Sequence, residues 1–207
     1  FLLSIIVFLF YLLLITNFVI FKIDITWIYY ISYIFFIFTS INFIIFQRSE
    51  LINTILNNKI YFIFFSFFLI LSLLPLSSAD SYAYHLAWPQ DLILNPKMIF
   101  DPLEMEYRVV GIGEIVNYVG LLFGTENLQS FLCCVVIFYY VIRKKNKHLL
   151  FLLILSTPVF LKYSLDQKPF LLPCIVFTIF LGNLINKIHL NDIKNLDLIG
   201  FFLSLYF

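Results

Sequence analysis

The most polar stretch of this chain, residues 77 to 92, gathers side chains that can exchange protons. It reads SSADSYAYHLAWPQDL, and Asp80 contributes a carboxylate, Tyr84 a phenol and His85 an imidazole. A carboxylate within hydrogen-bond distance of a hydroxyl can take its proton as that hydroxyl attacks an electrophile. We therefore take Asp80 as the candidate base, with Tyr84 and His85 as candidate substrate contacts.

A structural interpretation of the same stretch competes with the chemical one. Asp80 could be the N-cap of a short helix over residues 80 to 88, which Pro89 would end or kink. Asp80 and Tyr84 would then share one face of that helix. His85 would be an interfacial residue, and Trp88 would belong to an aromatic belt at the lipid headgroups. The sequence leaves both interpretations open.

Three charged residues further along the chain could complete a site. Arg108 and Lys168 are cations that could neutralise a phosphate group, and Glu114 could bind hydroxyls or orient a cation. Lys168 stands beside Pro169 at an expected helix start, where the helix dipole favours acids. Lys168 is therefore interpreted either as a phosphate contact or as a lysine that reaches past the bilayer edge to water.

The segment GIGEIVNYVGLLFG, residues 111 to 124, has the spacing of an amphipathic or half-buried helix. Its apolar residues recur at intervals of three and four, while Glu114, Asn117 and Tyr118 occupy another sector. The segment lacks the third glycine of a dinucleotide-binding fingerprint, so we reject that function. We expect a helix that lies on the outer membrane surface and covers a cavity.

The composition places these residues in a membrane protein. The chain has 207 residues, of which 62% are hydrophobic and only 12% charged, and its mean hydropathy is +1.00. A soluble domain has roughly 25% charged residues. The three cysteines lie in apolar runs without metal-ligand spacing to the histidines, so no zinc or haem site is predicted, and a divalent metal is left open. We expect the bilayer as a partner and no nucleic acid.

The apolar runs predict an all-α polytopic transmembrane helix bundle of about six spans plus a truncated seventh. A helix of roughly 20 residues crosses the hydrocarbon core. The expected spans are residues 1 to 21, 25 to 46, 60 to 77, 128 to 142, 148 to 164, 169 to 186, and a last one from 198. We treat residues 1 to 207 as a single transmembrane domain and expect it to be a fragment of a longer protein.

The basic residues give this bundle an orientation. The RKKNK run, residues 143 to 147, fixes one loop on the cytoplasmic side by the positive-inside rule. Alternation then places eight basic and three acidic residues inside, and five basic and nine acidic residues outside. The long loop of residues 78 to 127 is therefore expected to be extracytoplasmic, with short interfacial helices and the candidate site in it.

These motifs resemble those of the bacterial polytopic GT-C glycosyltransferases and their uncharacterised relatives. The resemblance lies in Asp80 followed by YHL and a proline after a membrane helix, in Gly111, Gly113 and Glu114, and in LDQKPF before a later span. It covers about residues 75 to 182. Three spans precede the acidic loop here, whereas members of the group usually have the loop after their first span.

The resemblance implies a function. Such a protein would move a sugar from a polyprenyl-phosphate donor to an acceptor on the extracytoplasmic side of the bacterial inner membrane, for cell-envelope glycan or glycolipid assembly. Asp80 would be the catalytic base, and Tyr84, His85, Arg108, Glu114 and Lys168 would bind substrate. The alternatives are a transporter or flippase, a lipid-linked polysaccharide polymerase, and an accessory subunit without chemistry. Sugar, acceptor and oligomeric state are left open.

Overall fold

The computed structural model is all-α over the part of the chain that it describes. The described residues are 2–42, 45, 48–73, 85–95, 112–143, 147–157, 162, 171–189 and 194–206, and they contain ten helices. No strand occurs among these residues. The predicted fold class is confirmed at this level.

Each expected span corresponds to a helix, but several helices are shorter than predicted. The bounds are α1 Leu2–Ile20, α2 Ile25–Asn42, α4 Lys59–Ser72, α8 Leu128–Ile142, α9 Lys147–Ser156, α11 Leu171–His189 and α12 Asn195–Tyr206. The connection between α2 and α4 holds an additional helix, α3 Arg48–Asn57, which the apolar pattern did not predict because six of its ten residues are polar.

Two helices are long and apolar enough to cross a bilayer. They are α1, with a mean hydropathy of 2.6 over Leu3–Ile20, and α2, with 1.3 over Ile25–Asn42. Helices α4, α8, α11 and α12 are apolar but give shorter stretches. The structure therefore gives a weak indication of membrane association, and the bundle of about six spans is not confirmed.

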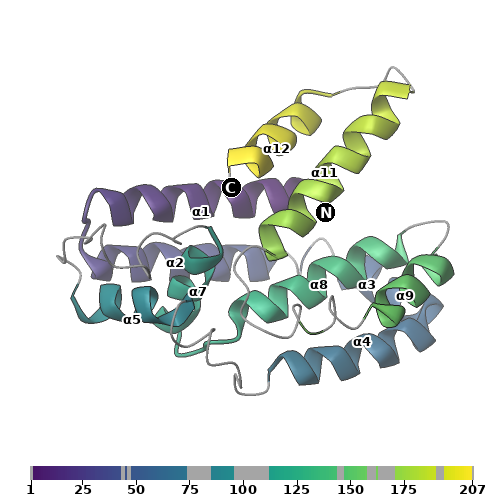
Figure 1. Cartoon of the computed structure of the whole chain (residues 1–207), viewed down its shortest axis with the longest axis horizontal. Helices are drawn as coiled ribbons and strands as arrows, with labels where there is room; N and C mark the ends of the chain where they lie inside the picture. Colours follow the sequence, from purple (N-terminus) through teal and green to yellow (C-terminus); the bar gives the residue numbers. More distant parts are fainter. Residues whose placement is uncertain are drawn as a thin grey trace.

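Helix α7, Ile112–Leu122, lies at the centre of the packing. It contacts α1, α8, α11 and the short helix α5, Ala87–Leu94 (Figure 1). Residues 113 to 120 are all buried. The helix expected from the pattern exists, and it is buried inside the protein, which agrees with the half-buried alternative. Its polar sector faces α5 and the segment before it, so that protein rather than water covers the sector.

The helices fall into two groups along the long axis of the molecule. Helices α1 and α2 run antiparallel at one end, while α8 begins near the end of α2 and extends away with α4 and α9 (Figure 1). Leu128, at the start of α8, lines one cavity with Ile41, at the end of α2. Alternation places Leu128 at the outer end of one span and Ile41 in the inner half of another, five residues before its expected end, so the two residues should be roughly 20 Å apart along the membrane normal. The structure does not align α2 and α8 as neighbouring spans.

The sequence predicted that Pro89 would end or kink the helix of the polar stretch, but Pro89 does not end it. It is the third residue of α5, which continues to Leu94. The first backbone N–H groups of a helix have no partner inside the helix, so a proline in the first turn loses no hydrogen bond. The expected helix start near Asp80 lies outside the described residues.

Helices α11 and α12 pack closely through one glycine. A methyl group on Gly200 would come within 2.1 Å of the buried Phe180 ring. Asp197 of α12 also links the two helices, because its carboxylate accepts hydrogen bonds from Lys187 Nζ at 2.6 Å and from the Lys194 backbone N–H at 3.0 Å. Helix α12 also contacts α1, and helix α11 contacts α7.

Candidate functional site

The structure brings together two of the residues that the sequence selected, His85 and Glu114. His85 stands two positions before the first residue of α5, and Glu114 is the third residue of α7. His85 Nδ1 lies 3.3 Å from Glu114 Oε1, although 29 positions separate them in the chain. The packing of α5 against α7 creates this pair.

Both side chains are largely removed from solvent. The His85 side chain is 12% exposed and the Glu114 side chain 2%. A buried carboxylate is unfavourable unless a hydrogen-bond donor compensates it. Glu114 is compensated by the imidazole, and it also stands in the first turn of α7, where the helix dipole favours a negative charge.

Asn117 joins the pair one helical turn after Glu114. Its Nδ2 donates to the backbone oxygen of His85 at 3.3 Å, which ties the segment before α5 to α7 a second time. The Asn117 side chain is buried, and its Oδ1 has no hydrogen-bond partner among the described residues. The sequence analysis noted Asn117 only as part of a polar sector. Its spacing of three residues from Glu114, in an otherwise apolar helix, was the signal that the two act together.

The surroundings of the pair are apolar and aromatic. Trp88 and Leu92 of α5 are buried against Val116 and Val119 of α7, in the same hydrophobic cluster as the inner face of α1. The ring of Trp88 lies 6.5 Å from the ring of Tyr118. Burial raises the pKa of Tyr118 above its ordinary value, and the charge of Tyr11 contributes in the same direction. The predicted position of Trp88 in an aromatic belt is wrong, because its ring is inside the protein.

A neutral imidazole beside a carboxylate has a defined chemical capacity. An ionised carboxylate only accepts hydrogen bonds, so the His85 Nδ1–H donates to Glu114. The second ring nitrogen, Nε2, then carries the lone pair, and it can accept a proton or a hydrogen bond from a hydroxyl. When the ring is protonated, Nε2 instead becomes a donor to an anionic oxygen. The pair can therefore serve either a hydroxyl or a phosphate.

The remaining candidate residues lie outside the described part of the chain. They are Asp80, Tyr84, Arg108 and Lys168. Asp80 and Tyr84 are within five residues of His85 along the chain, so the chain itself limits how far they lie from the pair. Among the described residues, no group of three or more histidine, cysteine, aspartate or glutamate side chains could hold a metal ion.

Comparison with known protein families, curated proteins and solved structures finds no match to this chain.

Proposed function

We propose that this chain belongs to a membrane glycosyltransferase that moves a sugar from a polyprenyl-phosphate donor to an acceptor on the extracytoplasmic side. The observation that carries the proposal is the buried pair of His85 and Glu114. Both residues were selected from the sequence as substrate contacts, and they come from separate segments that packing brings together. The apolar composition and the two long apolar helices support a substrate carried on a lipid.

In this proposal Asp80 takes the proton of the acceptor hydroxyl as its oxygen attacks the anomeric carbon. The bond from that carbon to the phosphate oxygen breaks, and the polyprenyl phosphate leaves with the bonding electrons. His85, oriented by Glu114, donates from Nε2 to an oxygen of the departing phosphate. Arg108 and Lys168 are the cations that would neutralise the remaining phosphate charge.

The test is sugar transfer in membranes from cells that make the full-length protein. Labelled hexosyl and pentosyl polyprenyl phosphates are the donors, and label in the lipid and glycan fractions is counted. Asp80→Asn should lower transfer by about 10²-fold to 10⁴-fold, the usual contribution of a general base. Glu114→Gln should lower kcat about tenfold or more while KM for the donor changes little, because the ring loses its orientation.

Glu126→Gln is the matched control, because it removes one carboxylate from the same loop at a position twelve residues after Glu114. It should keep wild-type transfer. If Asp80→Asn is expressed normally and still transfers sugar at the wild-type rate, Asp80 is not the catalytic base. If no donor is used, and labelled lipid-linked sugar instead crosses the membrane in a protein-dependent way, the protein is a flippase and the transferase proposal is wrong.

A further inference from the structure

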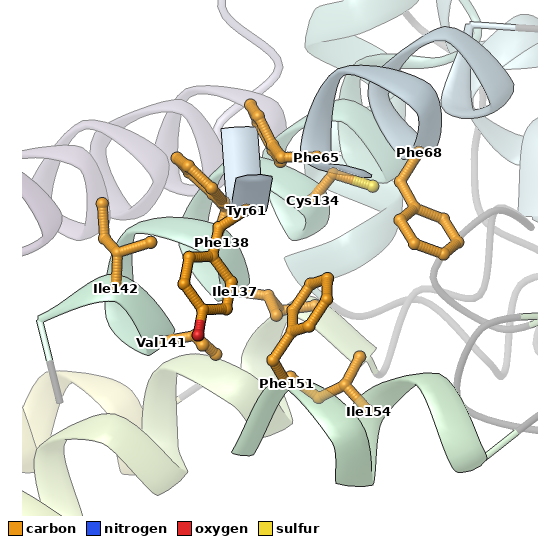
Figure 2. Close-up of a pocket in the computed structure, with 10 residues that line it drawn as sticks. All are labelled: Tyr61, Phe65, Phe68, Cys134, Ile137, Phe138, Val141, Ile142, Phe151 and Ile154. Atoms are coloured by element: carbon orange, nitrogen blue, oxygen red, sulfur yellow. The ribbon is translucent and has the colours of Figure 1, made fainter. Parts of the chain in front are cut away.

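A second feature, distant from His85 in the fold, combines an apolar cavity with a basic edge. The cavity lies between α4, α8 and α9 and has a volume of about 50 Å³. Figure 2 shows the side chains that converge on it from these helices. They are Tyr61, Phe65, Phe68, Cys134, Ile137, Phe138, Val141, Ile142, Phe151 and Ile154.

The lining suits hydrocarbon rather than water. A water molecule needs about 10 to 15 Å³ of such volume together with two to four polar partners. The volume here is sufficient for several small groups, but the lining offers only the Tyr61 hydroxyl and the Cys134 thiol as polar groups. The rings of Phe65 and Phe138 are stacked 4.1 Å apart in the wall. A short stretch of an alkyl chain matches this space.

Tyr61 connects the cavity to the polar edge beside it. Its ring lines the cavity, and its hydroxyl is hydrogen-bonded to Nδ1 of His148 at the start of α9. Lys147 Nζ lies 5.7 Å from the centre of the same ring and donates to Asn58 Oδ1 at 2.7 Å. An ammonium and an imidazole therefore stand directly at one end of the apolar space.

The charges around this end are almost all positive. The described basic residues on α3, α4, α8 and α9, or directly after them, are Arg48, Lys59, Arg143 and Lys147, and the one acid within these four helices is Glu50. The outer faces of α4 and α9 next to the cavity are apolar and exposed. Ile63, Phe64 and Phe67 lie on α4, and Leu149 and Leu152 lie on α9. A lipid would meet hydrocarbon along these faces and cations at their end.

We propose that this cavity is a binding site for an anionic membrane phospholipid. A segment of one acyl chain fills the space between α4, α8 and α9, and the phosphate contacts Lys147 and His148. The match between headgroup charge and the basic edge selects an anionic lipid over a zwitterionic one, because each basic residue near the headgroup strengthens binding about fivefold. The site is separate from the pair of His85 and Glu114 and does not depend on the proposed transferase function.

The test uses the full-length protein, purified in detergent, with phosphatidylglycerol and phosphatidylcholine of identical acyl chains. Native mass spectrometry counts the lipid molecules that each variant retains. Wild type should retain phosphatidylglycerol in preference to phosphatidylcholine. Lys147→Gln should lower this preference about fivefold. Lys22→Gln removes the same charge from an exposed position in the turn after α1, so it should leave the preference unchanged.

A second variant tests the apolar half of the site. Ile137→Trp should fill the cavity and lower the retention of both lipids, and Lys147→Gln keeps the proposal testable if that variant fails to fold. The proposal is overturned if wild type retains the two lipids equally or if Lys147→Gln behaves like Lys22→Gln. It is also overturned if soluble glycerol phosphate displaces phosphatidylglycerol completely, because the acyl chain would then contribute nothing.

Discussion

The coupling between His85 and Glu114 gives a quantitative prediction. The perturbations are His85→Ala, Glu114→Ala and the double variant, and the measured quantity is the free energy of unfolding. With a protonated imidazole, two unit charges at the observed 3.3 Å would attract by ~5 kcal/mol at an effective dielectric constant of about 20. Desolvation of the buried carboxylate offsets much of this, and hydrogen bonds to charged groups contribute about 1.5 to 3 kcal/mol net. We therefore expect a coupling energy of about 2 kcal/mol.

The single variants should be unequal. His85→Ala leaves a buried carboxylate without the imidazole, and breaking a buried pair in this way costs about 3 to 5 kcal/mol. Glu114→Ala removes the buried charge itself, so it should cost less. This inequality follows from the exposure of the two side chains, because the carboxylate is the more deeply buried partner.

The assay is unfolding by sodium dodecyl sulfate in mixed micelles, followed by the fluorescence of Trp88. This chain has two tryptophans, and Trp88 is buried beside the pair while Trp27 is exposed, so a Trp27→Phe background isolates the signal. A control cycle between His85 and Asp197, which binds Lys187 on a different helix pair, should be additive to within about 0.5 kcal/mol. A coupling energy below about 0.5 kcal/mol between His85 and Glu114 would show that the two side chains do not stabilise each other.

Three further predictions concern packing, capping and pH. Gly200→Ala should destabilise the protein by about 1 to 3 kcal/mol because the new methyl overlaps a buried ring. Gly182→Ala, whose methyl would meet nothing closer than 3.8 Å, should instead stabilise α11 by up to about 1 kcal/mol. Unfolding in mixed micelles measures both free energies, and equal effects would contradict the close packing at Gly200. Asp197→Asn should lower the free energy of unfolding by about 1 to 2 kcal/mol, and Lys187→Gln should lower it less, because only Asp197→Asn also weakens the cap of α12. The reverse order in the same assay would show that the cap contributes nothing. Burial raises the pKa of Tyr118 above the unfolded value of 10.0, so the stability from the neutral phenol is complete below pH 10 and is lost as pH rises above it. Tyr118→Phe should reduce this loss of stability at alkaline pH. An unchanged pH dependence would exclude Tyr118 as its source.

Helix positions were predictable from the sequence because each apolar run is bounded by polar residues or prolines. The bounds of α8 were predicted correctly, and those of α1 differ by one residue at each end. The lengths of α4 and α9 were not predictable, since an apolar residue after the last helical turn looks the same in the sequence as one within it. Helix α3 was missed because Arg48, Glu50 and several asparagines hide its weak apolar face.

The site was predictable in its residue types but not in its pairing. His85 and Glu114 were selected because ionisable residues are rare in an apolar chain. Their contact depends on the packing of α5 against α7, which a single sequence does not encode as a local pattern. The polar sector of α7 was assigned to the membrane surface for the same reason. The contacts of His85 with Glu114 and Asn117, and of Trp88 with Tyr118, show that the sector has a protein partner.

Cysteine labelling at Asp80→Cys tests our proposal that the polar stretch around Asp80 faces the outside and binds a lipid-linked sugar. Cys133, Cys134 and Cys174 are first replaced by serine or alanine. In intact cells, a maleimide that does not cross membranes should label position 80. Added polyprenyl-phosphate sugar should slow this labelling severalfold. Labelling that requires permeabilised cells, or that is unchanged by the lipid-linked sugar, would contradict the account.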